Sequence, residues 1–171
     1  MLNFLSNSKE NYAVNNVEWG NTIYLASFID WKTTSQGVKR GLCTCGYSIY
    51  KNQGCKERVS IRRDYFFGGE VESPYEAEMK ALLEGMIHVP PEEPLTIRTT
   101  QPSIANGVNR DLAFWSEHNW YTKQGTVVKC RQEWQKLLLI LQGRKIAALC
   151  TQEEEFMLLQ SGCRDLLQIY S

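Results

Sequence analysis

The sequence predicts an α/β domain built on a five-stranded mixed sheet, in which a three-strand antiparallel meander is followed by αβ units and flanking helices. Two observations carry this prediction. Three extended, apolar segments follow one another with only short turns between them. After them, two further strand patterns alternate with segments in which apolar residues recur at helical spacing. Short turns favour antiparallel neighbours and helical connections favour parallel ones, so the two halves together predict a mixed sheet.

The meander accounts for the first three strands, which are predicted over residues 22–29, 42–51 and 57–67. The first of them is a nearly continuous apolar run, which is typical of a central strand covered on both faces. A turn signal at residues 33–37 and an Asn-Gln-Gly sequence at residues 52–54 separate the strands.

Helical patterns begin where the meander ends. Ser73 is a predicted N-cap, and Pro74 fits the first position of a helix that runs until the two prolines at 90 and 91. The remaining elements are predicted as a strand over 95–99, a helix from 102, a helix over 131–141, a strand over 145–150 and a last helix over 153–170.

The chain has the size and charge of one folded domain. With 171 residues it can form one buried core. Residues 1–20 are polar and weakly patterned, so we expect an N-terminal extension there and the domain over residues 21–171. Lys and Arg together number 19, and Asp and Glu together also number 19, so the formal net charge is zero. This balance excludes a protein that coats nucleic acid by overall charge, but it allows a local basic patch.

The sequence lacks signals for a membrane. No apolar run approaches the roughly 20 residues that a membrane-spanning helix needs. The first residues lack the basic and apolar regions of a signal peptide. We therefore expect a cytoplasmic or nuclear protein without a membrane partner, whose six cysteines are ordinary reduced thiols.

Several local sequence patterns follow one another in an order that is informative when they are taken as a set. Residues 73–85 form a helix with Glu78 in its second turn, and residues 95–107 form a strand and helix with Gly107 at the end. Residues 119–122 and the run 127–137 follow. This set resembles the ribonuclease H type 1 family over roughly residues 22–171. The resemblance implies a ribonuclease H-like sheet, in a degenerate form similar to copies carried by viruses and reverse-transcribing elements.

The resemblance also implies an activity, the cleavage of the RNA strand of RNA–DNA hybrids by two Mg²⁺ ions that four carboxylates hold. Glu78 falls on the second of these acids. Asp30, after the first strand, is the candidate for the first acid, whereas a shifted register would place Ala26 there. Asp30 and Glu78 are therefore the candidate metal ligands.

The remaining two acids match less well. The third should close the fourth strand seven residues before Gly107, and Thr100 stands there. The fourth should lie at the start of the last helix; Asp165 is the candidate, and a second register would place Arg164 there. A hydroxyl is a weak substitute for a carboxylate, so we expect the residual catalytic set of Asp30, Glu78 and Asp165 to bind Mg²⁺ weakly or not at all.

Two basic surfaces are candidates for binding nucleic acid. On the third strand, Arg58 and Arg62 are expected to share one face with Ser60 between them. The second surface begins at residue 119, in the stretch that resembles the basic protrusion of the family and is called the protrusion below; it offers aromatic side chains that could stack on bases and cations that could contact phosphates. Its candidates are Trp120, Tyr121, Lys123, Lys129 and Arg131, with Trp120 and Tyr121 expected to be exposed and Trp115 and Trp134 expected in the core.

These observations favour one function and leave two alternatives open. The favoured function is a catalytically impaired ribonuclease H-like domain that binds an RNA–DNA hybrid or double-stranded RNA. The first alternative is a protein–protein interaction module on the same fold. The second is an active, divergent Mg²⁺-dependent ribonuclease H that uses Asp30, Glu78 and Asp165, with Thr100 or Asp111 completing the site.

Overall fold

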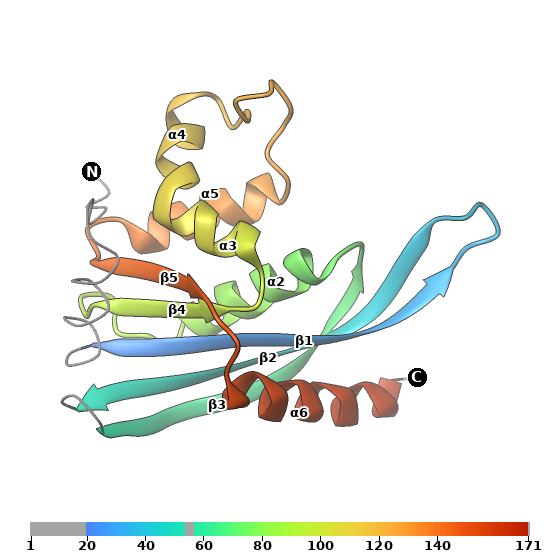
Figure 1. The fold of residues 1–171 in the computed structure, drawn as a ribbon, viewed down its shortest axis with the longest axis horizontal. Coiled ribbons are helices and arrows are strands. Elements are labelled where there is room, and N and C mark those ends of the chain that lie inside the picture. The colour runs from blue at the N-terminus through green and yellow to red at the C-terminus, as the bar shows by residue number, and fades with distance from the viewer. Residues whose placement is uncertain (1–19, 54–56, 171) are drawn as a thin grey trace.

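The fold is built on one sheet whose strands follow the predicted order along the chain. The computed structural model describes residues 20–53 and 57–170, so nearly all of the expected N-terminal extension lies outside the described residues. The strands are β1 (Asn21–Thr33), β2 (Lys39–Gln53), β3 (Glu57–Val71), β4 (Leu95–Thr99) and β5 (Ile146–Cys150). Their order across the sheet is β3-β2-β1-β4-β5 (Figure 1).

The pairing directions confirm the predicted mixed sheet. β1, β2 and β3 are antiparallel neighbours, whereas β1 pairs with β4, and β4 with β5, in parallel. Short connections join the antiparallel strands, and helices connect the parallel ones. β1 therefore lies in the middle of the sheet, where Ile23 and Leu25 are buried on one face and Tyr24 and Ala26 on the other.

Helices cover both faces of this sheet (Figure 1). They are α2 (Pro74–Met86), α3 (Pro102–Asn106), the π-helical turn η1 (Gly107–Asp111), α4 (Leu112–Glu117), α5 (Arg131–Leu141) and α6 (Glu154–Tyr170). α2 packs on the face of Ile23 and Leu25, and α6 packs on the face of Tyr24 and Ala26. No helix in the described part of the chain is long and apolar enough to cross a membrane.

The start of α2 follows the sequence signals. The Ser73 hydroxyl accepts a hydrogen bond from the Glu76 N–H at 3.3 Å, and Pro74 occupies the first turn. This cap fixes where the helix begins. It thereby places Glu78 in the second turn, facing the end of β4.

Trp134 of α5 is the anchor of the larger core, as predicted. Its side chain is fully buried, and its ring meets the half-buried Trp115 edge-on at a centroid distance of 5.3 Å. The Trp134 Nε1–H donates a hydrogen bond to the Tyr75 hydroxyl, which ties α5 to α2. Gly107 lies against the same ring, because a Cβ at this position would stand 2.3 Å from it.

This close approach gives a first prediction. Gly107→Ala is expected to destabilise the fold by about 1–3 kcal/mol, because the added methyl group overpacks the Trp134 pocket. Urea unfolding measures the effect. The double variant Gly107→Ala with Trp134→Phe should lose less than the sum of the single variants, because the smaller ring makes room. Strictly additive losses would contradict this steric explanation.

β3 departs from the predicted alternation. Between the pairs Asn52–Arg58 and Ile49–Arg62, β3 contains one residue more than β2. Such an insertion is a β-bulge, and it moves every later side chain to the opposite face. The expectation that Arg58 and Arg62 share one face is therefore wrong: Arg62 lies across from Ile49, on the face of the larger core.

Candidate functional site

Glu78 is the centre of the candidate site and is buried, with 1% of its surface exposed. The Thr99 hydroxyl donates to one carboxylate oxygen at 2.7 Å, and the Thr100 hydroxyl donates to the other at 2.8 Å. Burial raises the pKa of the Glu78 carboxyl to about 7, although the hydrogen bonds from Thr99 and Thr100 lower it in part. Glu78 is thus a desolvated carboxyl whose two oxygens are held by neutral hydroxyl groups.

The register between β1 and β4 shows which of the two candidate positions for the first acid, Asp30 or Ala26, lies near the end of β4. The parallel pairs end with Tyr24 beside Arg98, and two residues further on Ala26 is level with Thr100. Asp30 lies four residues beyond Ala26, which corresponds to about 13 Å along an extended strand. The structure therefore brings Ala26, and not Asp30, to the end of β4 where Thr100 binds Glu78.

Asp165 does not approach Glu78 either. α6 begins at Glu154, eleven residues earlier, so Asp165 is not at the start of the last helix. Asp165 is exposed and comes two residues after the buried Cys163, whose carbonyl accepts a hydrogen bond from Thr44 of β2. Two residues turn an α-helix by about 200°. Asp165 therefore lies on the outer side of α6. Glu78 is a residue of α2, which packs on the opposite face of the sheet.

Apolar side chains cover the position next to Thr100 on the α6 face. Ala26 is fully buried and belongs to a small cluster with Tyr24, Phe156 and Leu159. A carboxylate at position 26 would have to be desolvated among these groups, which is costly without a partner. The tertiary structure therefore surrounds position 26 of β1 with mainly apolar side chains.

The residues around Glu78 do not fit a pair of Mg²⁺ ions. Mg²⁺ needs several oxygen ligands in nearly octahedral geometry, and a pair of ions needs several carboxylates. Within residues 20–53 and 57–170, no group of three or more His, Cys, Asp or Glu side chains is arranged to hold a metal ion. Glu78 is the one acid that this part of the site contributes, and Thr99 and Thr100 already occupy its oxygens.

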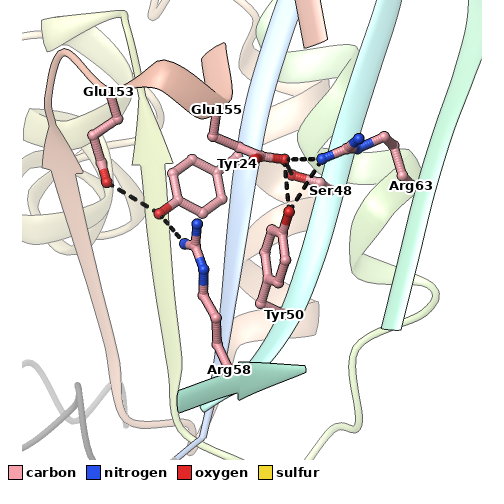
Figure 2. Close-up of polar contacts among 7 residues, drawn as sticks. All are labelled: Tyr24, Ser48, Tyr50, Arg58, Arg63, Glu153 and Glu155. Atoms are coloured by element: carbon pink, nitrogen blue, oxygen red, sulfur yellow. Dashed lines mark hydrogen bonds and ion pairs between the residues drawn. The ribbon is translucent and has the colours of Figure 1, made fainter. Parts of the chain in front are cut away.

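A polar network fixes the start of α6 to the sheet (Figure 2). Its first part centres on Tyr24, whose hydroxyl donates to Glu153 at 3.1 Å and accepts from Arg58 at 2.7 Å. The Arg58 guanidinium also stacks over the Tyr50 ring, 4.3 Å from its centroid. Arg98 of β4 forms an ion pair with Glu153 at 2.9 Å. Arg58, a predicted nucleic-acid contact, is therefore held by aromatic rings and a hydroxyl of its own chain.

The second part of the network centres on Glu155, which is 7% exposed. One of its oxygens accepts hydrogen bonds from Ser48 at 2.8 Å, from Tyr50 at 3.0 Å and from Arg63 at 2.6 Å. Burial acts to raise the pKa of Glu155, but these hydrogen bonds outweigh it and hold the pKa below its usual value. Glu155 thus stays ionised in the folded state and anchors α6.

The predicted residues of the protrusion and of β3 divide into exposed and packed groups. Tyr121 is 46% exposed, whereas Trp120 is half-buried and packs against the larger core, so the expectation that Trp120 is exposed is wrong. Lys123 lies over the Phe114 ring at 5.3 Å. The remaining members are exposed: Lys129, Arg131 and Arg62, of which Arg62 is paired with Asp64 at 3.0 Å.

The network around Glu155 is the feature that sequence reasoning missed. From the sequence alone, the run of three glutamates at residues 153–155 is interpreted most simply as an acidic first turn of the last helix, where the helix dipole favours negative charge. A signal was nevertheless present, because Tyr24, Ser48 and Tyr50 place hydroxyl groups in otherwise apolar strands. Buried hydroxyl groups need partners, and two of the three glutamates supply them.

The strand order and the helices on both faces define a ribonuclease H-type α/β fold. Solved structures share it at low sequence identity. The RNase H domain of PFV is 13% identical with a TM-score of 0.65, and the match covers 86% of this chain and 94% of that chain. A foamy viral protease-reverse transcriptase solved with dsDNA is 15% identical with a TM-score of 0.64, over 87% and 94% of the two chains.

A further match is LC11-RNase H1, solved with an RNA/DNA hybrid, which is 16% identical with a TM-score of 0.56 over 86% of this chain and 99% of that chain. No known family profile matches this chain, and no curated protein matches its sequence. The chain therefore has the ribonuclease H fold, and the predicted resemblance to ribonuclease H domains is confirmed at the level of the fold.

Proposed function

We propose that this chain is a catalytically impaired ribonuclease H-like domain that binds an RNA-containing duplex without cleaving it efficiently. The observation that carries the proposal is the environment of Glu78. At the end of β4, Thr100 donates a hydrogen bond to Glu78, and on β1 Ala26 is level with Thr100, so neither position supplies the acid that would be needed. Hydrolysis through two metal ions depends on several carboxylates that converge on one place, and a single buried glutamate does not supply them.

The proposed duplex binding is supported by the exposed cations of the protrusion, Lys123, Lys129 and Arg131. Structures with the same fold have been solved with dsDNA and with an RNA/DNA hybrid. With 19 basic and 19 acidic side chains, binding must come from a local surface, so the affinity should fall steeply with salt. We further propose that Mg²⁺ binds weakly or not at all.

One experiment tests binding and cleavage together. The protein is incubated with a labelled RNA–DNA hybrid in Mg²⁺ and in Mn²⁺, and the same duplex is used in a gel shift at low salt. We expect a shifted band, and cleavage at least about 100-fold slower than by an active ribonuclease H, because the catalytic groups do not converge. Lys123→Ala with Lys129→Ala should weaken the shift, whereas Lys145→Ala, at the start of β5, should leave it unchanged.

Glu78→Gln decides between the proposal and the active-nuclease alternative. Cleavage that disappears in this variant would make Glu78 a catalytic residue and the chain a working nuclease. Binding without cleavage, in both the wild type and the variant, supports the proposal.

A protein partner is the second candidate function. The outer side of α6 exposes Met157 to 71%, Leu158 to 52% and Ile169 to 75%. Absence of both binding and cleavage, together with concentration-dependent self-association, would favour this candidate.

A further inference from the structure

β1 and β2 continue beyond the sheet as a two-stranded arm, residues 31–40. Figure 1 shows this hairpin projecting away from the rest of the molecule. Burial decreases along β1 towards the arm: Ala26 is fully buried, residues 27–30 are half-buried, and every residue from Trp31 to Arg40 is exposed. The pairing nevertheless stays in register to the last pair, Thr33 with Lys39. The arm is therefore a regular β-ribbon with exposed residues on both strands, and the ion pair between Arg40 and Glu70 links its base to β3.

Local contacts hold the arm in shape. The Thr34 N–H donates to the Val38 carbonyl at 2.9 Å, and Gly37 adopts the positive φ of 77° that the tight turn requires. At the base, Trp31 pairs with Gly41, and the missing side chain of Gly41 makes room for the indole ring. Trp31 remains 42% exposed. The arm thus presents a fixed aromatic ring beside its two strands.

The charges on the arm are all positive and stand close together. Lys32 lies directly across from Arg40, and Lys39 is the next residue along β2. Like charges at opposite positions of a β-ribbon repel each other. Arg40 has an acidic partner, Glu70, at 3.6 Å, whereas neither Lys32 nor Lys39 has an ion-pair partner in the described part of the chain. An external anion would relieve this repulsion.

The arm borders a groove that leads to the protrusion. A hollow of about 610 Å³ runs along the arm and includes Lys32, Arg40 and Glu70 in its lining. A second hollow of about 410 Å³ shares Arg40 and Glu70 with the first and extends to Lys129. The two hollows are therefore neighbours on either side of the Arg40–Glu70 ion pair, with the arm beside the first and Lys129 beside the second.

We propose that the arm is a clamp for nucleic acid, in which Lys32, Lys39 and Arg40 contact backbone phosphates of a duplex that also touches Lys129. This inference rests on the proposed function and adds the arm to its binding surface. A two-stranded ribbon that carries Lys and Arg has the width and chemistry to follow a duplex backbone. Four glutamates, Glu70, Glu72, Glu76 and Glu133, also line the second hollow, so the phosphates are expected at Arg40 and Lys129 and not between them.

The composition of the tip favours nucleic acid over a lipid surface. Residues 34–37 read Thr-Ser-Gln-Gly and contain no apolar side chain that could enter a bilayer. Trp31 stands at the base of the arm and not at its tip. In this position an exposed indole can stack on a base or lie against a ribose while the lysines contact phosphates.

The test measures the affinity for a short labelled RNA–DNA hybrid by fluorescence anisotropy over a salt series. The double variant Lys32→Ala with Lys39→Ala should bind about five- to tenfold more weakly, and its slope of log affinity against log salt should be shallower by about 1–2. Glu70→Gln should bind about twofold more tightly, because it frees Arg40. A gain of affinity cannot arise from misfolding. Lys145→Ala is the matched control.

The outcomes separate this inference from the proposed function. A wild type that binds no duplex would overturn both. Duplex binding that is weakened by Lys123→Ala with Lys129→Ala, but unchanged by the arm variant, would overturn the arm alone. Binding only to vesicles of phosphatidylcholine and phosphatidylserine would overturn both and assign the arm to a membrane surface.

Discussion

At pH 8, replacing Glu78 by glutamine is expected to stabilise the fold by about 2 kcal/mol. Glutamine has nearly the same shape and carries no charge, so it removes the cost of burying a carboxylate. Its carbonyl can accept from the hydroxyl and the N–H of Thr100, and its amide can donate to the Thr99 hydroxyl, so each of the three hydrogen bonds of the wild type has a counterpart.

The sign of the pH dependence follows from the raised pKa of Glu78. The carboxyl titrates near 4.5 in the unfolded chain and at about 7 in the folded protein, so the folded state binds its proton more tightly. The stabilisation is fully present below pH 4.5 and is lost as the pH rises through 7, in total about 3 kcal/mol. Glu78→Gln should therefore have little effect at pH 4.5 and its full effect at pH 8.

Urea unfolding at pH 4.5, 6 and 8 checks this expectation. Glu84→Gln is the matched control, because Glu84 lies on the exposed side of the same helix. A wild type and a Glu78→Gln variant whose stability difference does not change with pH would contradict the buried, raised-pKa carboxyl. A difference that disappears on adding Mg²⁺ would show that Glu78 binds the metal after all.

Glu155→Gln is expected to destabilise the fold by about 2–4 kcal/mol at pH 7, the opposite sign to Glu78→Gln. One oxygen of Glu155 accepts hydrogen bonds from Ser48, Tyr50 and Arg63, and the Ser48 hydroxyl is fully buried. The neutral amide weakens the contact with Arg63 and gives the cluster an additional donor in place of an acceptor. The variant thereby weakens the polar contacts of α6 with β2 and β3, while the Thr44–Cys163 hydrogen bond and the apolar contacts remain.

The pH dependence of this second variant is also opposite in sign. The pKa of Glu155 is lower in the folded state than in the unfolded chain. Its contribution is therefore present above the unfolded pKa of about 4.5 and is lost as the pH falls through the folded value. The difference between the wild type and Glu155→Gln should shrink in acid. Thermal unfolding at pH 3 and pH 7 measures it, and Glu154→Gln, one residue earlier and exposed, should have no comparable effect.

Much of the fold could be predicted from the sequence, because its signals are local. The N-cap at Ser73, the proline after it and the apolar run of β1 determine where elements begin and which are buried. The positions of Glu78 and Thr100 follow from those elements. Their direct contact at 2.8 Å is the geometric consequence of a helix start packed against a strand end.

The exposure of the candidate nucleic-acid contacts was harder to predict. A strand pattern assumes strict alternation, so it could not show that the bulge in β3 turns Arg62 away from Arg58. Exposure of Trp120 also depended on packing that its neighbours in sequence do not specify. The arm was predicted only as a turn, because nothing in residues 31–40 indicates that two strands continue past the edge of the core.

The sequence by itself determined the α/β order of elements, the mixed sheet and the position of Glu78 on α2, since hydrophobic period, caps and turns act over a few residues. The tertiary structure decided which residue of β1 lies beside Thr100, and it chose Ala26 over Asp30. It also turned Glu153 and Glu155 inward, because the buried hydroxyl and guanidinium groups of distant strands need partners. Strand register and the pairing of buried polar groups join residues far apart in the chain, so no local pattern specifies them.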